Sequence, residues 1–311
     1  MVSIEKLKKD SKTYFYISKN FRIGVNKWKK IRIYFGGKEP TKEDIKKLAE
    51  EIETRAIKEG LVKEKTTYKY LKDEEAEVLE DIKSEFNKFM KNLPETAREK
   101  YVEDFLIRFT YNSNAIEGNR LSLRDTHLIL QENIIPQGAT TYEYNEVLNS
   151  KNCMKFIKEY KGEFNKTFVL KVHESLTKNT KITVVGKYRD HDVIITGSPH
   201  RPPKHSEVSG LMEKLFIWYN NNKNRLHPIE LACLVHSEFT RIHPFADGNG
   251  RTARIISNFL LKKNGHSMFF IDVKDRRKYY EALDKSDAGD ERGFVKFIFD
   301  IIINQLKSVS R

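Results

Sequence analysis

The spacing of apolar residues predicts that most of this chain is α-helical. From Lys72 onward, apolar residues recur with the helical period in nearly every segment. These segments end at clusters of helix-breaking residues, among them Asn92-Leu93-Pro94, Pro136-Gln137-Gly138 and the asparagine-rich run 220–224. The body of the protein is therefore expected to be a bundle of helices.

The first forty residues show a different pattern, in which strand-forming residues cluster. Two such runs, 14–17 and 31–35, predict a small N-terminal β-hairpin. Beyond them, Thr41 and Asp44 have capping-box spacing, and the apolar face that follows continues to Gly60. We therefore expect a hairpin followed by a helix.

A second β-type pattern interrupts the helices between Gly186 and Pro203. Its centre, Val193-Ile194-Ile195-Thr196, is β-branched, and Gly197-Ser198-Pro199 is typical of a turn. The Pro202-Pro203 pair excludes a helix. We expect a short β-hairpin inside an otherwise helical domain.

Composition narrows the class of protein. The 311 residues suffice for one large domain or two modest ones, and the 39% hydrophobic content is enough to build a core. No apolar run is long enough to span a bilayer and no leader pattern is present, so we expect a cytoplasmic protein without a membrane partner. Only Cys153 and Cys233 occur, both in helix-like patterns, which indicates neither a disulfide framework nor a thiolate metal site.

The net charge of +13 raises the question of a nucleic-acid partner, because clustered Lys and Arg release counterions when they bind phosphates. Most lysines, however, are mixed with Glu and Asp along solvent faces, as between Lys42 and Glu59. This mixture is typical of exposed helices with surface ion pairs. A nucleic-acid partner is therefore the less favoured interpretation.

One segment between two predicted helices carries the densest chemistry, and it reads His243-Pro244-Phe245-Ala246-Asp247-Gly248-Asn249-Gly250-Arg251-Thr252-Ala253-Arg254. Two glycines flank Asn249 and let the backbone aim its N–H groups into the space ahead of the second helix. The start of that helix adds partial positive charge. Arg251 and Arg254, spaced i and i+3, project toward the same anion. The segment therefore predicts a site that holds several phosphates.

Two further groups give this site a chemistry. Asp247 would quench the positive charge unless it carries a divalent cation that bridges phosphate oxygens. His243 titrates near neutral pH and is the candidate general base for a hydroxyl nucleophile. Singly, these residues are typical of caps, turns and surface, but their combination predicts a catalytic site.

The segment resembles the signature of the Fic (Fido) family, His-x-Phe-x-(Asp/Glu)-Gly-Asn-Gly-Arg-x-x-Arg, at every specified position. The resemblance implies that His243 deprotonates a Tyr, Thr or Ser of a target protein. It implies that Asp247 holds Mg²⁺ between the α- and β-phosphates of ATP. It extends roughly from Tyr101 to Ile303, so we expect a catalytic domain at 101–311 after an N-terminal region, 1–100, of unknown role.

The same resemblance assigns the remaining residues of the segment. It implies that Gly248, Asn249 and Gly250 line the phosphates, with Arg251 and Arg254 on the outer ones. ATP is then the nucleotide partner, and Gly250 favours its ordinary orientation, because a kinase-like variant of the family has Lys at that position.

Two other parts of the chain resemble the family. Residues 186–203 look like the Fic flap, in which Val193, Ile194, Ile195 and Thr196 would pair with the extended backbone of a target. Tyr279 and Tyr280 stand where the family walls the adenosine. Apart from the resemblance, an ordinary surface hairpin and a pair of core aromatics explain these patterns as well.

Ser113-Asn114-Ala115-Ile116-Glu117-Gly118 resembles the inhibitory motif of the family, (Ser/Thr)-x-x-x-Glu-(Gly/Asn). A carboxylate can pair bidentately with an arginine whose proper partner is the γ-phosphate. Glu117 would occupy Arg254 in this way and misalign the α-phosphorus for attack. The pattern alone could simply end a helix, but beside the catalytic segment it predicts an inhibitory helix near 101–118 with Ser113 and Glu117 as regulatory residues.

The sequence thus predicts a mainly α protein, a Fic-type helical bundle with a β-hairpin flap, preceded by a small hairpin-plus-helix region. The expected function is an autoinhibited, magnesium-dependent protein adenylyltransferase that moves AMP from ATP to a protein hydroxyl, with itself among the candidate targets. Related Fic chemistry remains an alternative: phosphoryl or phosphocholine transfer, or AMP removal. A basic nucleic-acid-binding protein with a silent site is another. A homo-oligomer is compatible with the sequence, which does not identify the target.

Overall fold

The computed structural model describes residues 2–9, 12–24, 27–59, 61 and 68–309. Its internal contacts divide the chain into two compact units, Met1–Thr66 and Thr67–Arg311. The sequence pattern had suggested a boundary near residue 100. The helix 73–92 nevertheless packs within the second unit, because its buried residues Leu79 and Ile82 join the core of that unit.

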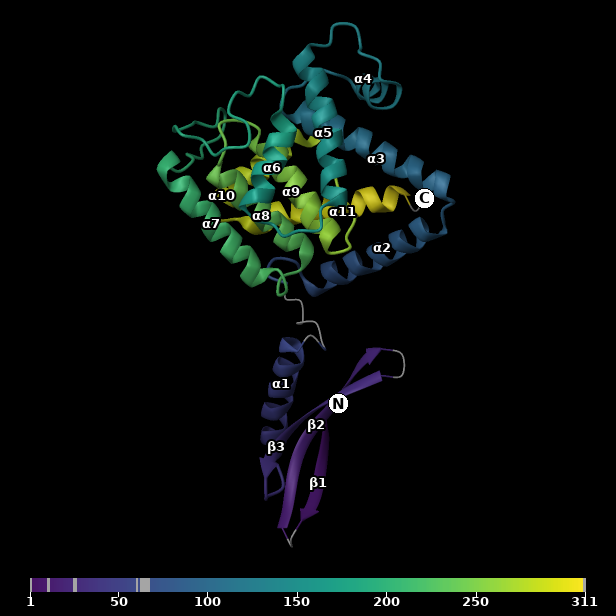
Figure 1. Ribbon diagram of the computed structural model, residues 1–311, viewed down its shortest axis with the longest axis vertical. Helices are drawn as coiled ribbons and strands as arrows, with labels where there is room; N and C mark the ends of the chain where they lie inside the picture. The colour runs from purple at the N-terminus through teal and green to yellow at the C-terminus, as the bar shows by residue number, and fades with distance from the viewer. Residues whose placement is uncertain (1, 10–11, 25–26, 60, 62–67, 310–311) are drawn as a thin grey trace. The chain divides into compact units, whose positions relative to one another are not determined.

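The first unit is a three-stranded antiparallel sheet with one helix against it. The strands lie in the order β1-β2-β3, and Figure 1 shows the helix α1 beside them. The elements are β1 (Ser3–Lys9), β2 (Lys12–Gly24), β3 (Lys27–Gly36) and α1 (Lys42–Lys58). A small core between sheet and helix consists of Ile17, Phe21, Ile31, Ile52 and Ala56. Burial of these side chains is what holds α1 on the sheet.

Two features of this unit compare directly with the sequence pattern. The predicted hairpin is the β2–β3 pair, but β1 was missed, because lysines at Lys6 and Lys8 break the alternation of apolar residues. The capping box of α1 is confirmed. Thr41 N–H donates to Asp44 Oδ2 at 2.9 Å, and Asp44 N–H donates to Thr41 Oγ1 at 3.2 Å.

The second unit is a bundle of helices. In chain order they are α2 (Asp73–Asn92), α3 (Glu95–Ile116), α4 (Leu123–His127), the π-helix η1 (Leu128–Glu132), α5 (Thr141–Glu159), α6 (Lys166–Thr177), α7 (His205–Asn222), α8 (Pro228–Ile242), α9 (Asn249–Lys263), the short 3₁₀ helix η2 (Val273–Asp275), α10 (Arg276–Asp287) and α11 (Glu291–Val309). The mainly helical fold class predicted from the sequence is confirmed. None of the described helices combines the length and apolar character that a membrane crossing requires.

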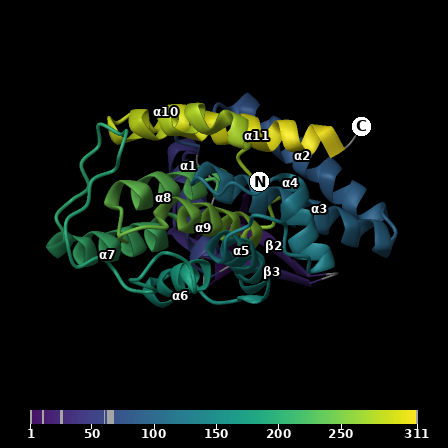
Figure 2. The same ribbon diagram turned by 90° about the horizontal axis from the view of Figure 1, so that it is seen from above.

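The helices α8 and α9 form the centre of the bundle. In Figure 2, α10 and α11 lie along one side of this pair and α5, α6 and α7 along the other. Both central helices are buried over most of their length, with Phe239, Ile255 and Phe259 at most 2% exposed. The loop that joins them, which carries the predicted catalytic segment, is therefore fixed by the core on either side.

Residues 186–203 do not form the predicted β-hairpin. The expected turn is present, since Ser198 N–H donates to Ile195 O at 3.3 Å, but the two arms form no strand ladder. The backbone of the arms is bonded elsewhere: the Arg189 guanidinium donates to His191 O at 3.0 Å and to Pro203 O at 2.5 Å. The prolines of the second arm also lack the N–H groups that a ladder needs.

Candidate active site

The loop between α8 and α9 is shaped by two residues in the left-handed backbone region. His243 (φ 50°) ends α8, and Gly248 (φ 79°) precedes α9. A side chain at Gly248 would place its Cβ 3.1 Å from Thr177 Cγ2 and 3.4 Å from His173 Nε2, so the position is both strained and crowded for any other residue. No side chain caps α9. Its first N–H groups are therefore available to an anion, as predicted.

Asn249 braces this loop with its side chain. Its Oδ1 accepts from Phe245 N–H at 2.9 Å, and its Nδ2 donates to Phe245 O at 2.8 Å. The residue is 2% exposed. The contact with phosphates predicted for Asn249 can therefore come only from its backbone, while the side chain closes the loop.

We expect Asn249→Ala to lower stability, because it leaves two buried backbone groups of Phe245 without partners. The loss should be about 2 kcal/mol or more, which lowers the melting temperature by about 4–8 °C. Thermal unfolding followed by circular dichroism measures it. Asn145→Ala, which removes a single exposed bond to Asn179 O, is the matched control and should cost under about 1 kcal/mol. Equal losses in the two variants would contradict this role.

His243 is held in the tautomer that a general base requires. Its Nδ1 lies 3.3 Å from Thr240 O, and because a carbonyl oxygen only accepts, Nδ1 carries the proton. The Nε2 lone pair is then available. Burial, followed by the charge of Arg189, lowers the pKa of His243 to about 4. The imidazole is therefore neutral at physiological pH and can accept a proton.

Asp247 has the position and chemistry of a cation ligand. Its side chain is exposed, and its Oδ1 accepts from Gly248 N–H at 2.5 Å. That bond aims the carboxylate across the start of α9, where the phosphates are expected. Carboxylate oxygen with several waters is the ligand set that Mg²⁺ prefers, so Asp247 fits the predicted ion.

The two predicted regulatory residues meet the second arginine of the site. Arg254 is 2% exposed; its Nη2 lies 2.7 Å from Glu117 Oε1 and 2.8 Å from Ser113 O, and its Nε lies 3.0 Å from Ser113 Oγ. The pairing is through one carboxylate oxygen rather than the bidentate contact expected from the sequence, because Ser113 Oγ accepts from Nε and Ser113 O shares Nη2 with Glu117. Nη1 is buried without a protein partner among the described residues.

The carboxylate of Glu117 occupies the space directly above Gly250. A Cβ at Gly250 would lie 2.4 Å from Glu117 Oε1 and 3.2 Å from Arg254 Nη1. Burial alone would raise the pKa of Glu117, but the charge and hydrogen bond of Arg254 lower it below the ordinary value. Glu117 is therefore an anion in the place that the glycine-framed loop and the helix start prepare for a phosphate.

Arg251 has an acidic partner that the sequence did not reveal. Its Nη1 donates to Glu146 Oε1 at 2.8 Å, and Asn119 Nδ2 donates to Glu146 Oε2, also at 2.8 Å. Asn119 lies two residues beyond Glu117 and, through Glu146, links the end of α3 to Arg251. Both arginines of the predicted phosphate site are thus tied to the same end of α3. The residues around Glu146 in the sequence do not indicate this contact. It exists only because α5 packs against α9.

Two residues that the sequence analysis missed fasten the loop to its surroundings. His173 stacks on Phe245 with ring centroids 3.7 Å apart; its Nδ1 accepts from Gly186 N–H at 3.0 Å, so its Nε2–H donates to Asp247 O at 3.0 Å. Burial lowers the pKa of His173 to about 4, so the ring is neutral at neutral pH. Arg189, whose side chain is fully buried, donates to His243 O at 2.9 Å.

The predicted flap residues lie on the outer side of this arrangement. Ile194 is 71% exposed, and exposure alternates along Val193, Ile194, Ile195 and Thr196. The segment is anchored at its tip, because Ser198 Oγ donates to Asp284 Oδ1 at 2.6 Å. Residues 193–196 form no strand pairing within the domain, so the predicted docking role does not depend on a preformed hairpin.

The two tyrosines that were predicted to line a nucleoside site differ from each other in their exposure. Tyr279 is 1% exposed, and its hydroxyl bonds His236 Nε2 at 2.8 Å, so it is part of the core. Tyr280 is 37% exposed and its hydroxyl reaches Ile116 O at 3.4 Å, at the end of α3. Of the pair, only Tyr280 has surface that a nucleoside could contact.

A second group of metal-binding side chains lies away from this loop. Among the described residues, Glu80, His227 and His266 place ligand atoms within 4.8 Å of one another. Lys83 Nζ, however, is 3.2 Å from His266 Nε2 and 3.3 Å from Glu80 Oε2, so an ammonium group already neutralises the cluster. His227 begins α8 and His243 ends it, which separates the two places by about 22 Å.

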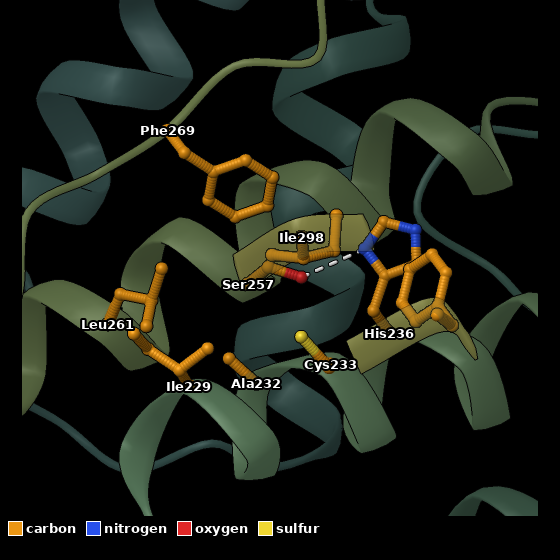
Figure 3. A pocket seen from close by; sticks show the side chains of 9 residues that line it. Ile229, Ala232, Cys233, His236, Ser257, Leu261, Phe269 and Ile298 are labelled. Atoms are coloured by element: carbon orange, nitrogen blue, oxygen red, sulfur yellow. Dashed lines mark hydrogen bonds between the residues drawn. The ribbon is translucent and has the colours of Figure 1, made fainter. Parts of the chain in front are cut away.

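A small void between α8, α9 and α11 is part of the core rather than a binding site (Figure 3). Its walls are mostly apolar, and it has no room for a water molecule. Figure 3 shows the bond across its edge, in which His236 Nδ1 donates to Ser257 Oγ at 2.9 Å. Burial lowers the pKa of His236 to about 3, so this histidine is neutral and structural.

The helix–loop–helix of α8 and α9, with its glycine-framed helix start, belongs to a known family of domains. Residues 163–261 match the model of the Fic/DOC family. The chain therefore contains a Fic/DOC-family domain, which confirms the resemblance carried by residues 243–254. The matched residues end before α10 and begin after α3, so the segment with Ser113 and Glu117 lies outside them.

Curated proteins similar to this chain include two that are named protein adenylyltransferase Fic. The one from Nematostella vectensis is 32% identical over 202 residues, which cover 63% of this chain and 47% of the relative. The one from Aedes aegypti is 35% identical over 199 residues, which cover 62% and 40%. The chain thus spans less than half the length of either curated relative.

Solved structures show the same fold. A Fic-domain-containing signalling protein from Bacteroides thetaiotaomicron is 26% identical, with a TM-score of 0.69 over 75% of this chain and 95% of the other. Residues 134–508 of Fic-1 from C. elegans match with a TM-score of 0.66 at 24% identity, over 87% and 77% of the two chains. The Fic-type bundle predicted from the sequence is therefore confirmed.

Proposed function

We propose that this protein is an adenylyltransferase that moves AMP from ATP to a hydroxyl of a protein and that is held back by its own Glu117. The observation that carries the proposal is the state of His243: a neutral imidazole whose Nδ1–H is fixed on Thr240 O and whose Nε2 is left as the base, at the end of an anion-binding loop. The names of the relatives support the same activity.

The residues of the loop have distinct parts in the proposed reaction. The N–H groups of Asn249 and Gly250 and the guanidinium groups of Arg251 and Arg254 bind and orient the phosphates of ATP, and Gly248 lines the same space. His243 Nε2 removes the proton of the target hydroxyl. The hydroxyl oxygen then forms a bond to the α-phosphorus while the bond to the β-phosphate oxygen breaks, and pyrophosphate leaves with that electron pair. Mg²⁺, held by Asp247, would neutralise phosphate charge when bound.

The target hydroxyl is proposed to be presented by the flap segment. The alternating exposure of residues 193–196 is the pattern that an added strand needs, since every second side chain faces away from the domain. Main-chain pairing orients a hydroxyl without selecting strongly for target sequence. A Tyr, Thr or Ser in an extended segment is therefore the proposed substrate class, including a segment of a second copy of this chain.

Inhibition is proposed to come from competition for positive charge. Glu117 binds Arg254 and fills the space above Gly250. The outermost phosphate of ATP can therefore neither bind Arg254 nor occupy that space. ATP bound around this obstacle would present its α-phosphorus out of line with His243 and the target oxygen. Displacement of Glu117 restores the site.

The test is the identity of the group transferred. The Glu117→Gly variant is incubated with Mg²⁺ and ATP labelled on either the α- or the γ-phosphate, and protein-bound label is measured. We expect label from the α-phosphate alone. Label from the γ-phosphate would establish phosphoryl transfer instead, and an absence of label with both, in the presence of cell lysate as a source of targets, would contradict a transferase.

A further inference from the structure

The sheet of the first unit has one covered and one uncovered face. Ile17, Phe21 and Ile31 point toward α1, so residues in the alternate positions of β2 and β3 point away from it. Within the described part of residues 1–66, α1 is the only helix. The surface opposite α1 therefore carries no helix of its own unit.

Positive charge is concentrated in the strands of this sheet. Residues 1–36 contain ten Lys and Arg against two Asp and Glu, a net charge of +8. Residues 37–66, which include α1, contain eight of each and are neutral. More than half of the +13 charge of the chain thus belongs to its first 36 residues. The mixed charges of the chain as a whole concealed this basic segment, because the helices that follow have similar numbers of acidic and basic residues.

Acidic residues in and just after α1 pair with two of the lysines on one face of the sheet. Lys6 and Lys8 also fall on that face by the strand alternation. Lys19 pairs with Glu53, and Lys29 Nζ lies 3.0 Å from Glu59 Oε2, both on the α1 side. On the uncovered side, the strand alternation places Lys9, Lys12, Lys30 and Arg32, all of them exposed. Among the described strand residues, Glu5 is an acid on this side; it contacts Lys30 and lies 3.2 Å from Arg32 Nε.

Aromatic side chains lie between these cations. Tyr34 is flanked by Tyr16 and Tyr14, at centroid distances of 5.2 and 6.3 Å, and the Arg32 guanidinium lies 3.7 Å from the centroid of Tyr16. Trp28 is 62% exposed. Because the tyrosine rings already pack on one another and on Arg32, they are poor platforms for separate unstacked bases. Instead, the packed rings form a rigid surface between the basic side chains.

We propose that this surface binds double-stranded DNA. We call it the open face, and it consists of Lys9, Lys12, Tyr14, Tyr16, Trp28, Lys30, Arg32 and Tyr34. Its cations match the charge of the phosphate backbone. Adjacent strands lie about 4.8 Å apart, and a two-stranded ribbon such as β2 and β3 fits a major groove about 12 Å wide. Strands that enter a groove in this way are a known mode of DNA binding. The inference is independent of the proposed transferase activity, since none of its residues belongs to the second unit.

The test is the binding of a fluorescently labelled 20-base-pair duplex of mixed sequence to the full chain, followed by anisotropy at several salt concentrations. We expect the logarithm of the binding constant to fall with the logarithm of salt with a slope of about −3 to −4, as four phosphate contacts give. The double variant Lys30→Ala/Arg32→Ala should bind at least about tenfold more weakly and lose about two units of slope. The double variant Lys46→Ala/Lys47→Ala removes the same charge from the exposed side of α1 and should change affinity by less than about twofold.

A third variant separates binding from folding. Glu5→Gln releases Lys30 and Arg32 and removes an acid from the open face, so it should tighten duplex binding several-fold. A damaged fold cannot produce that gain. Tighter binding to single-stranded DNA or to RNA than to the duplex would overturn the proposal, as would equal losses in the two double variants. ATP binding, measured alongside, should be the same in every variant.

Discussion

Glu117→Gly should raise the rate of AMP transfer by about a hundredfold or more over the wild type. Removal of the carboxylate frees Arg254 Nη2, to which Glu117 Oε1 is bonded at 2.7 Å, and empties the space above Gly250. Removal of one preorganised donor aimed at transition-state charge typically costs about 10²–10³-fold in rate, so release of Arg254 should gain a factor of that order. The rate of label incorporation from α-labelled ATP, at fixed ATP and target concentrations, measures the effect. The variant should also stay folded, because Glu117 caps the end of α3, where glycine is well tolerated.

Two comparison variants identify the cause of such an activation. Glu117→Gln keeps the size of the side chain but loses its charge, so it should activate less than Glu117→Gly. Glu103→Gly weakens α3 by a similar glycine substitution at an exposed position without touching Arg254, and it should not activate. Activation by Glu103→Gly would show that loosening of α3 matters rather than the ion pair. A Glu117→Gly rate within about twofold of the wild-type rate would show that Glu117 is not inhibitory.

His243→Ala, introduced into the Glu117→Gly protein, should lower AMP transfer by about a thousandfold or more while ATP still binds. A positioned general base contributes about 10²–10⁴-fold, and no second neutral imidazole of the loop has a nitrogen left for the target. His173, the nearest candidate, uses both ring nitrogens on Gly186 N–H and Asp247 O. Transfer rate and equilibrium binding of a fluorescent ATP analogue are the two measurements, and retention of binding shows that the site is intact.

The pH profile of the Glu117→Gly protein tests the same assignment. The pKa of His243 is lowered to about 4 by burial, and the neutral form is the active one. As pH falls from 8 toward 5 the rate should hardly change, and it should fall once pH approaches about 4. Loss of Glu117 moves the pKa further down, because that carboxylate raises it in the wild type. A rate that halves near pH 6.5, the ordinary pKa of His, would contradict a buried neutral base.

Local sequence was sufficient for the elements on which this site is built. The start of α8 at Pro228 and the end of α9 at Asn264-Gly265 follow from capping preferences that act within a few residues. The glycines that frame Asn249 likewise act on their own backbone. For this reason the loop, the helix start behind it and the spacing of Arg251 and Arg254 were predicted correctly from the sequence.

The incorrect predictions share one physical cause: the contacts of a side chain depend on residues that are distant in the sequence. Tyr279 had the place of a nucleoside wall, but His236 and the core take it. The flap had a hairpin pattern, but Arg189 binds His191 O and Pro203 O at the base of its two arms, and the prolines of the second arm lack N–H groups.

By itself, the sequence determined the helical class and the segment 243–254 with its Fic-type signature, because these depend on residue type and short-range spacing. The acidic partner of Arg254 lies 137 residues away and was predicted only through the motif resemblance. Tertiary structure alone decided the tautomer of His243, the tie between Arg251 and Glu146 and the division of charge between the two faces of the N-terminal sheet. Each of these depends on which atoms meet across segments far apart in the chain. Hydrogen bonds and ion pairs act over a few ångströms, so only the folded packing can specify them.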